Sequence, residues 1–208
     1  MRSDALKNRQ RLLAAAGQVF AEQGLEASVA DVARVAGVGM GTLYRHFSSK
    51  EALVDALVTD VLETTIALAR AAAARPDGTG LEHFLRASSA SQAEHLGCLP
   101  KLWITDHHLV QTARARIAAL LSDAQAHGCI RRDLRSTDIS LALWSMRGVL
   151  ETTGPNAREA WERHLDLLIA GMRPTDAELA HGPLGQDQID RILARREASP
   201  THTMRASR

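Results

Sequence analysis

One stretch of the chain carries polar and cationic side chains at close helical spacing. Between residues 39 and 50 it contains Tyr44, Arg45, His46 and Lys50, together with two glycines. An arginine side chain can donate two hydrogen bonds to a guanine edge, which is worth about 1–3 kcal/mol of base discrimination. Lys50 falls in the first turn of an expected helix, where a cation is unfavourable unless an anion such as phosphate lies nearby. This combination of groups indicates a surface that contacts DNA.

Two short helices and a tight turn would position these side chains. Ser28 is a good N-cap, and Asp31 can complete an acidic variant of the capping box. Gly37 ends the first helix where a left-handed residue is required. Leu43 and Phe47 would form the buried stripe of the second helix. The first helix has its own apolar face, made by Val29, Val32, Ala33 and Ala36. The pattern is a helix-turn-helix whose second helix faces a major groove.

An ordinary helical hairpin could also show a small residue, a turn glycine and an apolar stripe. The residues after the turn favour the DNA-binding reading, because the run GVGMGTLYRHFSSKEAL resembles the TetR family of bacterial transcriptional regulators. In that family the recognition helix and the start of the next helix commonly read G-T-L-Y-x-H-F-x-S-K-E-x-L. The matching residues are Gly41, Thr42, Leu43, Tyr44, His46, Phe47, Ser49, Lys50, Glu51 and Leu53.

The resemblance implies which residues contact DNA. The base-reading set is Met40, Gly41, Thr42 and Arg45, and the phosphate-binding set is Ser28, Tyr44, His46 and Lys50. Met40 offers only apolar contact, and the two glycines permit close backbone approach, so DNA shape should contribute much of the recognition. His46 could instead be a packed neutral histidine, and Lys50 a solvated surface lysine.

Composition and periodicity predict an all-α protein. The 208 residues are 45% apolar and only 3% aromatic, proline is scarce, and no segment alternates with period two. The net charge is only +1, yet residues 1–50 hold more basic than acidic side chains. We expect a three-helix DNA-binding head at residues 1–50, a larger helical body for ligand binding and dimerisation at 51–173, and a polar tail at 174–208.

The expected elements follow from apolar stripes and Gly or Pro breaks. Residues 1–7 are expected to form a mobile basic arm, and Ser48 with Glu51 a capping box for the fourth helix. One more helix is expected near residues 187–197, with the last ten residues disordered. The remaining expected helices span residues 7–23, 51–74, 80–95, 101–108, 110–127, 137–153 and 157–172.

The last two body helices should pair with those of a second subunit. Together they carry more apolar surface than a small body can cover, which favours a four-helix interface. In the TetR family these helices form the dimer interface, and the run AHGCIRRDLRSTDI before them also resembles family members, more loosely. The expected interface residues are Leu143, Met146, Leu150, Trp161, Leu165 and Leu168.

The family resemblance also implies a small-molecule effector held in the body, whose binding moves the long fourth helix. A coupling of about 1–3 kcal/mol would be typical. The candidate lining residues are Phe84, Ser88, His95, Trp103, His107 and Trp144, which suggest a largely apolar effector with one or two polar handles. The alternative is that these residues are ordinary core.

Other chemistries find little support in the sequence. His107 and His108 are adjacent, about 100° apart on a helix, and cannot chelate one ion together. The sequence holds no zinc-site spacing, nucleophile elbow, phosphate loop or dinucleotide fingerprint. We therefore expect no metal, no cofactor and no enzyme activity. The alternative function is an all-helical ligand-binding dimer or enzyme that has no specific operator.

The expected location is the cytoplasm. No segment has the roughly 18 apolar residues of a membrane span, and the N-terminus lacks the apolar run of a secretion signal. Cys98 and Cys129 belong to no C-x-x-C pattern, so reduced thiols in the core are expected, with a redox pair as the less favoured alternative.

Overall fold

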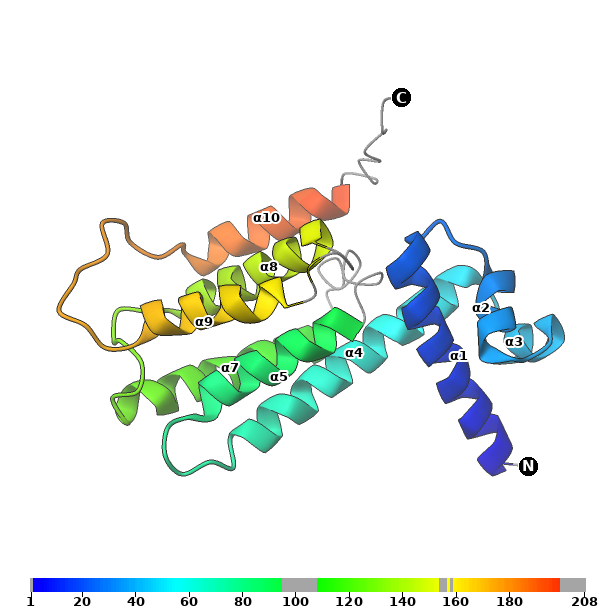
Figure 1. Cartoon of the computed structure of the whole chain (residues 1–208), viewed down its shortest axis with the longest axis horizontal. Helices are drawn as coiled ribbons and strands as arrows, with labels where there is room; N and C mark the ends of the chain where they lie inside the picture. The colour runs from blue at the N-terminus through cyan, green and yellow to red at the C-terminus, as the bar shows by residue number, and fades with distance from the viewer. Residues whose placement is uncertain (1, 95–107, 154–156, 158, 199–208) are drawn as a thin grey trace.

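The computed structural model describes residues 2–94, 108–153, 157 and 159–198, and all regular elements in these ranges are helices. An all-α fold is thereby confirmed. Figure 1 shows a small head built on the first helices and a larger body, joined by one long helix. The helices are α1 (Arg2–Gln23), α2 (Val29–Ala36), α3 (Met40–His46), α4 (Lys50–Ala72), α5 (Gly80–Glu94), α7 (His108–Ala126), α8 (Ser136–Thr153), α9 (Ala160–Met172) and α10 (Gln186–Ala198).

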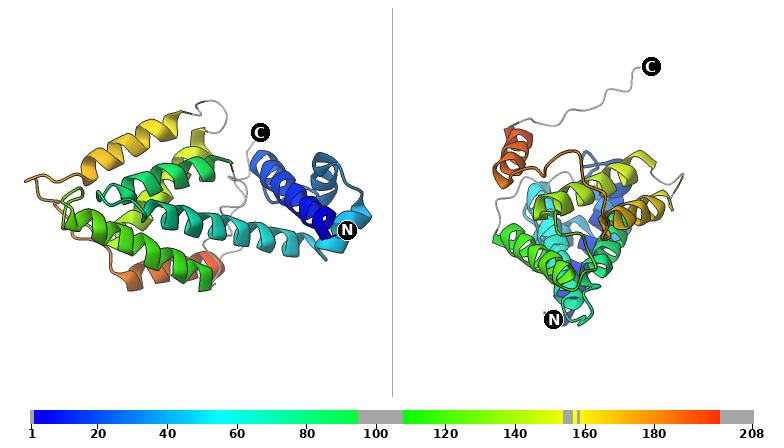
Figure 2. Two further views of the ribbon diagram at one scale, coloured as in Figure 1. Left: turned by 90° about the horizontal axis from the view of Figure 1, so that it is seen from below. Right: turned by 90° about the vertical axis from the view of Figure 1, so that its left-hand side faces the viewer.

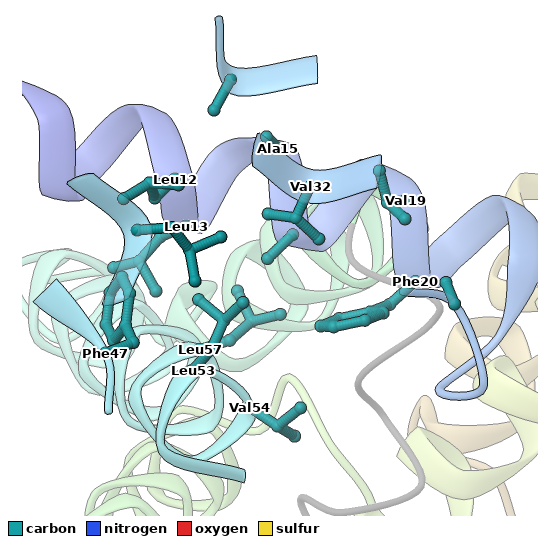
Figure 3. Packing of buried hydrophobic residues seen from close by; sticks show 14 of the residues in the cluster. Leu12, Leu13, Ala15, Val19, Phe20, Val32, Phe47, Leu53, Val54 and Leu57 are labelled. Carbon is teal, nitrogen blue, oxygen red and sulfur yellow. The ribbon is translucent and has the colours of Figure 1, made fainter. Parts of the chain in front are cut away.

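The head is built on one hydrophobic cluster from α1, α2, α3 and the first half of α4. Phe47 lies at one end of this cluster below Leu12 and Leu13, and Phe20 lies at the other (Figure 3). Leu43 is fully buried, so the stripe predicted for the second helix of the motif is confirmed. Because α3 is only two turns long, its orientation depends on this packing rather than on helix propensity.

The turn of the helix-turn-helix forms for the reasons the sequence indicates. The Ser28 Oγ accepts the backbone N–H of Asp31 at 3.2 Å and caps α2. Gly37 adopts φ 64°, and the backbone N–H groups of Gly37 and Val38 donate to the carbonyls of Arg34 and Ala33 at 3.1 and 3.0 Å. This left-handed cap ends α2 and directs the chain into α3.

Two expectations about helix starts were wrong. The chain is helical from Arg2, so residues 2–7 extend α1 instead of forming a mobile arm. The N-cap of α4 is Ser49, whose Oγ accepts the Ala52 N–H at 3.2 Å, and not Ser48. Both serines can cap a helix, and the buried position of Phe47 sets where α4 begins.

The body consists of the second half of α4 with α5, α7, α8 and α9 around a second cluster. The turn from α4 to α5 is tight. A Cβ atom at Gly80 would lie 2.8 Å from the Ala72 carbonyl oxygen and 3.2 Å from Leu120 Cδ2, so only glycine allows this approach. Asp77 fixes the turn by accepting the N–H and hydroxyl of Thr79 at 3.1 and 2.6 Å.

The long helix α4 belongs to both parts of the molecule. Its residues up to Leu62 pack in the head cluster, and its residues from Ala69 pack in the body cluster. The first turn of α7 also reaches the head, because Leu109 and Val110 pack against the head cluster. The division at residue 50 therefore stays a proposal, since packing places the first half of α4 with the head.

The end of the chain forms a hairpin and one further helix. In Figure 2, α9 lies along one edge of the body and α10 along the opposite edge. The α8–α9 hairpin is bridged by Ser145 Oγ and His164 Nε2 at 3.1 Å. The tail helix predicted near residues 187–197 is confirmed as α10, which buries Ile189 and pairs Asp190 with Arg114 of α7 at 3.3 Å. The helix expected at 101–108 and the last ten residues lie outside the described residues, apart from His108, which begins α7.

Candidate nucleic-acid interface

The outer face of α3 carries the predicted base-reading side chains. Met40 is 37% exposed, and Gly41 and Arg45 are also exposed, while Thr42 is half-buried and its N–H caps the helix on the Gly39 carbonyl at 2.9 Å. Tyr44 is 50% exposed. The fully buried Leu43 on the opposite side fixes α3 to the head and turns these groups outward.

The predicted phosphate-binding residues divide into two groups. Tyr44, His46 and Lys50 lie on α3 and at the first position of α4, with His46 and Lys50 half-buried. In the part of the chain that the structure describes, neither Arg45 nor Lys50 contacts a carboxylate. Their charges are therefore available to an external anion.

Ser28, by contrast, has its hydroxyl group engaged. Its Oγ donates to the Asp31 Oδ2 atom at 2.7 Å, and Asp31 Oδ1 also accepts from Arg34 Nη2 at 2.9 Å. Hydrogen bonds from Arg34 and then Ser28 hold the pKa of the Asp31 carboxyl below its usual value. Ser28 is exposed, but its single proton is committed to an ionised carboxylate, so a phosphate contact would have to displace that bond.

Sequence reasoning missed two arginines of α1. The guanidinium carbon of Arg9 lies 5.5 Å from the centroid of the Phe47 ring, over its face. Arg11 Nη2 approaches the turn of the motif and would lie 3.0 Å from a Cβ at Gly37. The sequence signal that could have identified Arg9 is its helical spacing. Arg9 lies four residues before Leu13 and seven before Ala16, on the side of α1 that packs on the head cluster.

Only half of the predicted effector-site residues can be placed. Phe84 and Ser88 are buried on α5, and Trp144 is half-buried on α8. His95, Trp103 and His107 lie outside the described residues. Phe84 is a member of the body cluster, which agrees with the alternative that these residues belong to the ordinary core. The role of all six residues in lining an effector site stays a prediction.

The predicted dimer residues differ in their burial within one chain, and their role at a subunit interface stays a prediction. Met146, Leu150 and Leu165 are buried within a single chain and leave little side-chain surface for a partner subunit to cover. Leu143, Trp161 and Leu168 are only partly buried, and the neighbouring Leu167 is 57% exposed. The apolar surface of the hairpin that remains available therefore centres on these four residues.

A pocket of ≈ 420 Å³ lies at the end of the body away from the head, between the α7–α8 loop and the segment after α9. Arg131, one of its lining residues, donates to Asp133 at 2.6 and 2.7 Å and to the Ala177 carbonyl at 2.8 Å. The hydrogen bonds from Arg131 hold the pKa of Asp133 below its usual value. The Arg131 guanidinium is therefore already engaged by groups of the chain itself.

Within the described ranges, no group of His, Cys, Asp and Glu side chains could hold a metal ion. None of the helices in these ranges combines the length and the hydropathy of a membrane span. Cys129 is half-buried, and its Sγ lies 3.5 Å from the Asp77 carbonyl oxygen, whereas Cys98 lies outside the described residues.

Comparisons with known proteins agree with this geometry. Residues 12–57 match the family model of bacterial regulatory proteins of the tetR family, and residues 75–174 match the C-terminal domain of SbtR-like transcriptional regulators. The crystal structure of a TetR transcriptional regulator from Streptomyces coelicolor is 34% identical, with a TM-score of 0.61, covering 80% of this chain and 99% of that one. A TetR transcription regulatory protein from Mycobacterium vanbaalenii is 32% identical, with a TM-score of 0.60, covering 83% and 99%.

A curated relative, the HTH-type transcriptional regulator TtgR of Pseudomonas putida, is 32% identical over 117 residues, which is 55% of this chain and 49% of that protein. The chain spans less than half the length of the curated relatives it matches first. Both domain models and both solved structures nevertheless agree on one assignment. The chain belongs to the TetR family of bacterial transcriptional regulators.

Proposed function

We propose that the protein is a ligand-responsive repressor that binds a pseudo-palindromic DNA operator as a homodimer. A small, largely apolar effector releases it. The observation that carries the proposal is the pose of α3, where Leu43 is buried in the head and Met40, Tyr44 and Arg45 face outward. A helix fixed in this way presents one face to a major groove.

The roles of individual side chains follow from their chemistry. Arg45 reads a guanine through two hydrogen bonds, and Met40 and Thr42 make weaker contacts to base edges. Gly41 lets the α3 backbone come close to the DNA. Tyr44, His46 and Lys50 hold phosphates and set the register without reading sequence.

Dimerisation would match the symmetry of the protein to that of its operator. Support comes from the α8–α9 hairpin, whose partly exposed Leu143, Trp161 and Leu168 adjoin the exposed Leu167. Burying such a surface against its own copy around a two-fold axis gives a four-helix interface. Two heads related by that axis would contact two half-sites in neighbouring major grooves.

Effector binding would act on the heads through α4 and α7. Helix α4 packs in both clusters, and Leu109 and Val110 bring the first turn of α7 against the head cluster. An effector held near Phe84, Ser88 and Trp144 shifts the spacing of the heads only if it binds the DNA-free arrangement more tightly. A coupling of about 1–3 kcal/mol would weaken operator binding about 5–150-fold.

Selection of binding sequences from a random pool of duplexes, with purified protein, tests this function. Enrichment of a pseudo-palindrome, with binding that weakens steeply as salt rises, is the expected result. A pool that shows no enrichment would contradict the proposal and favour a ligand-binding dimer or enzyme without an operator. If a pseudo-palindrome is enriched, the genes that lie beside its copies in the genome would supply candidate effectors for a release assay.

A further inference from the structure

We infer that Arg9 of α1 is a phosphate-binding residue of the head and that the Phe47 ring holds its guanidinium group in position. This inference rests on the proposed DNA-binding function and adds α1 to the DNA interface. Its starting point is the distance of 5.5 Å between the Arg9 guanidinium carbon and the Phe47 ring centroid, with the cation over the ring.

A position over an aromatic ring suits an arginine that must bind an anion. The guanidinium group is weakly hydrated and is attracted to the face of the ring, and its five N–H donors can serve an anion. Phe47 is buried and therefore forms a fixed platform. Less side-chain freedom is then lost when Arg9 donates to a phosphate, because the ring has already limited it.

The charge of Arg9 is not neutralised inside the protein. Among the residues that the structure describes, Arg9 is exposed and contacts no carboxylate. Several arginines of the body, by contrast, form ion pairs with carboxylates. The pairs are Arg86 with Asp166 at 2.9 Å, Arg131 with Asp133 at 2.6 Å and Arg147 with Glu151 at 2.7 Å. An arginine that is held in place but lacks an acidic partner is suited to an anion from outside the chain.

The location of Arg9 agrees with this role. The Phe47 ring that carries Arg9 also lies beside His46, with 6.3 Å between the two ring centroids, and the chain then enters α4 at Lys50. The corner between α3 and α4 thus gathers three cationic or potentially cationic side chains from α1, α3 and α4. Closely spaced phosphates along one DNA strand can meet several such groups at once.

The experiment measures binding of a short mixed-sequence duplex by fluorescence anisotropy over a range of salt concentrations. Arg9→Gln should lower the slope of log K against log salt by about 0.9 per subunit and weaken binding by roughly tenfold per subunit near 0.1 M salt. Arg70→Gln removes the same charge from an exposed position near the end of α4 and should leave the slope unchanged. Lys50→Ala serves as the positive control.

An Arg9→Gln slope equal to that of wild type would overturn the inference. Loss of salt-dependent binding in the wild-type protein itself would instead overturn the proposed function, so the two failures are distinguishable. Thermal unfolding of each variant shows whether the head remains folded.

The role of the ring needs a second comparison. Arg9→Lys should keep the salt slope but bind more weakly, because the ammonium group has no flat face or bidentate fork. Phe47→Leu should weaken binding in the wild-type background and have a smaller effect in the Arg9→Gln background. Equal effects of Phe47→Leu in both backgrounds, or wild-type affinity in Arg9→Lys, would overturn the part assigned to Phe47.

Discussion

The Ser28 hydroxyl group donates a 2.7 Å hydrogen bond to the Asp31 carboxylate and accepts the Asp31 backbone N–H at 3.2 Å. One pair of residues thus caps α2 and places an ionised carboxylate on the face of the head that we propose meets DNA. Arg34 compensates part of that charge through its own 2.9 Å contact to Asp31. The cap is favourable for folding, and its carboxylate opposes the approach of phosphate.

Asp31→Asn should therefore strengthen binding to duplex DNA by a few-fold, because one negative charge near the phosphates is removed. The Ser28 cap on the backbone N–H is retained, so the protein should remain folded, with a slightly lower thermal midpoint. Asp60→Asn, at an exposed position of α4, is the control for net charge. Equal gains in affinity for the two variants would show that Asp31 does not lie near the DNA.

Gly41→Ala should separate DNA binding from stability. A Cβ at Gly41 would meet nothing within 4 Å. Alanine in a helix is also more stable than glycine by up to about 1 kcal/mol. The urea midpoint should stay constant or rise, while affinity for the selected operator falls roughly tenfold, the scale of one disturbed base contact. Unchanged operator affinity would mean that the α3 backbone does not approach the DNA closely.

Gly80→Ala should have the opposite pattern, since its Cβ would lie 2.8 Å from the Ala72 carbonyl oxygen. Such overpacking against backbone costs about 1–3 kcal/mol of unfolding free energy. Urea unfolding measures this loss, with Gly41→Ala as the same substitution at an open position. A Gly80→Ala protein as stable as wild type would show that α4 and α5 separate without cost.

Acid should weaken the ion pair between Arg131 and Asp133 in the α7–α8 loop. The Arg131 guanidinium group lowers the pKa of Asp133 below its usual value of 3.8. A carboxyl whose pKa is lower in the folded state contributes stability above its unfolded pKa and loses it as pH falls through the folded pKa. The stability that this group contributes should therefore be complete at neutral pH and disappear below pH 3.8.

Urea midpoints measured from neutral pH downwards test this expectation. Asp133→Asn should lower the midpoint at neutral pH and show a smaller further loss in acid than wild type. Identical pH profiles for the two proteins would mean that the Arg131–Asp133 pair does not contribute to stability.

The head could be predicted from the sequence because each of its signals is local. Ser28, Gly37 and Leu43 specify a cap, a left-handed turn and a buried stripe, and each signal depends on residues a few positions away in the sequence. The contact between Arg9 and Phe47 could not be predicted in the same way, since it depends on how α1 crosses the start of α4. Ser48 and Ser49 are chemically equal as caps, so packing decided between them.

The hairpin illustrates a second limit of sequence patterns. Periodicity correctly indicated apolar stripes on α8 and α9, but an apolar stripe does not state which partner covers it. The core of the chain itself covers Met146 and Leu165, whereas Leu167, which the sequence analysis did not select, remains exposed. Burial within one chain had to be seen before the surface left for a second subunit could be named.

We propose that α3 reads DNA sequence through Arg45. Selection of binding sequences from one random duplex pool, by wild-type protein and by Arg45→Ala, tests this role. Wild type should enrich a pseudo-palindrome, and Arg45→Ala should enrich the same motif with the preference relaxed at a single position in each half-site, consistent with the loss of about 1–3 kcal/mol of discrimination there. An identical motif from both proteins would contradict the claim.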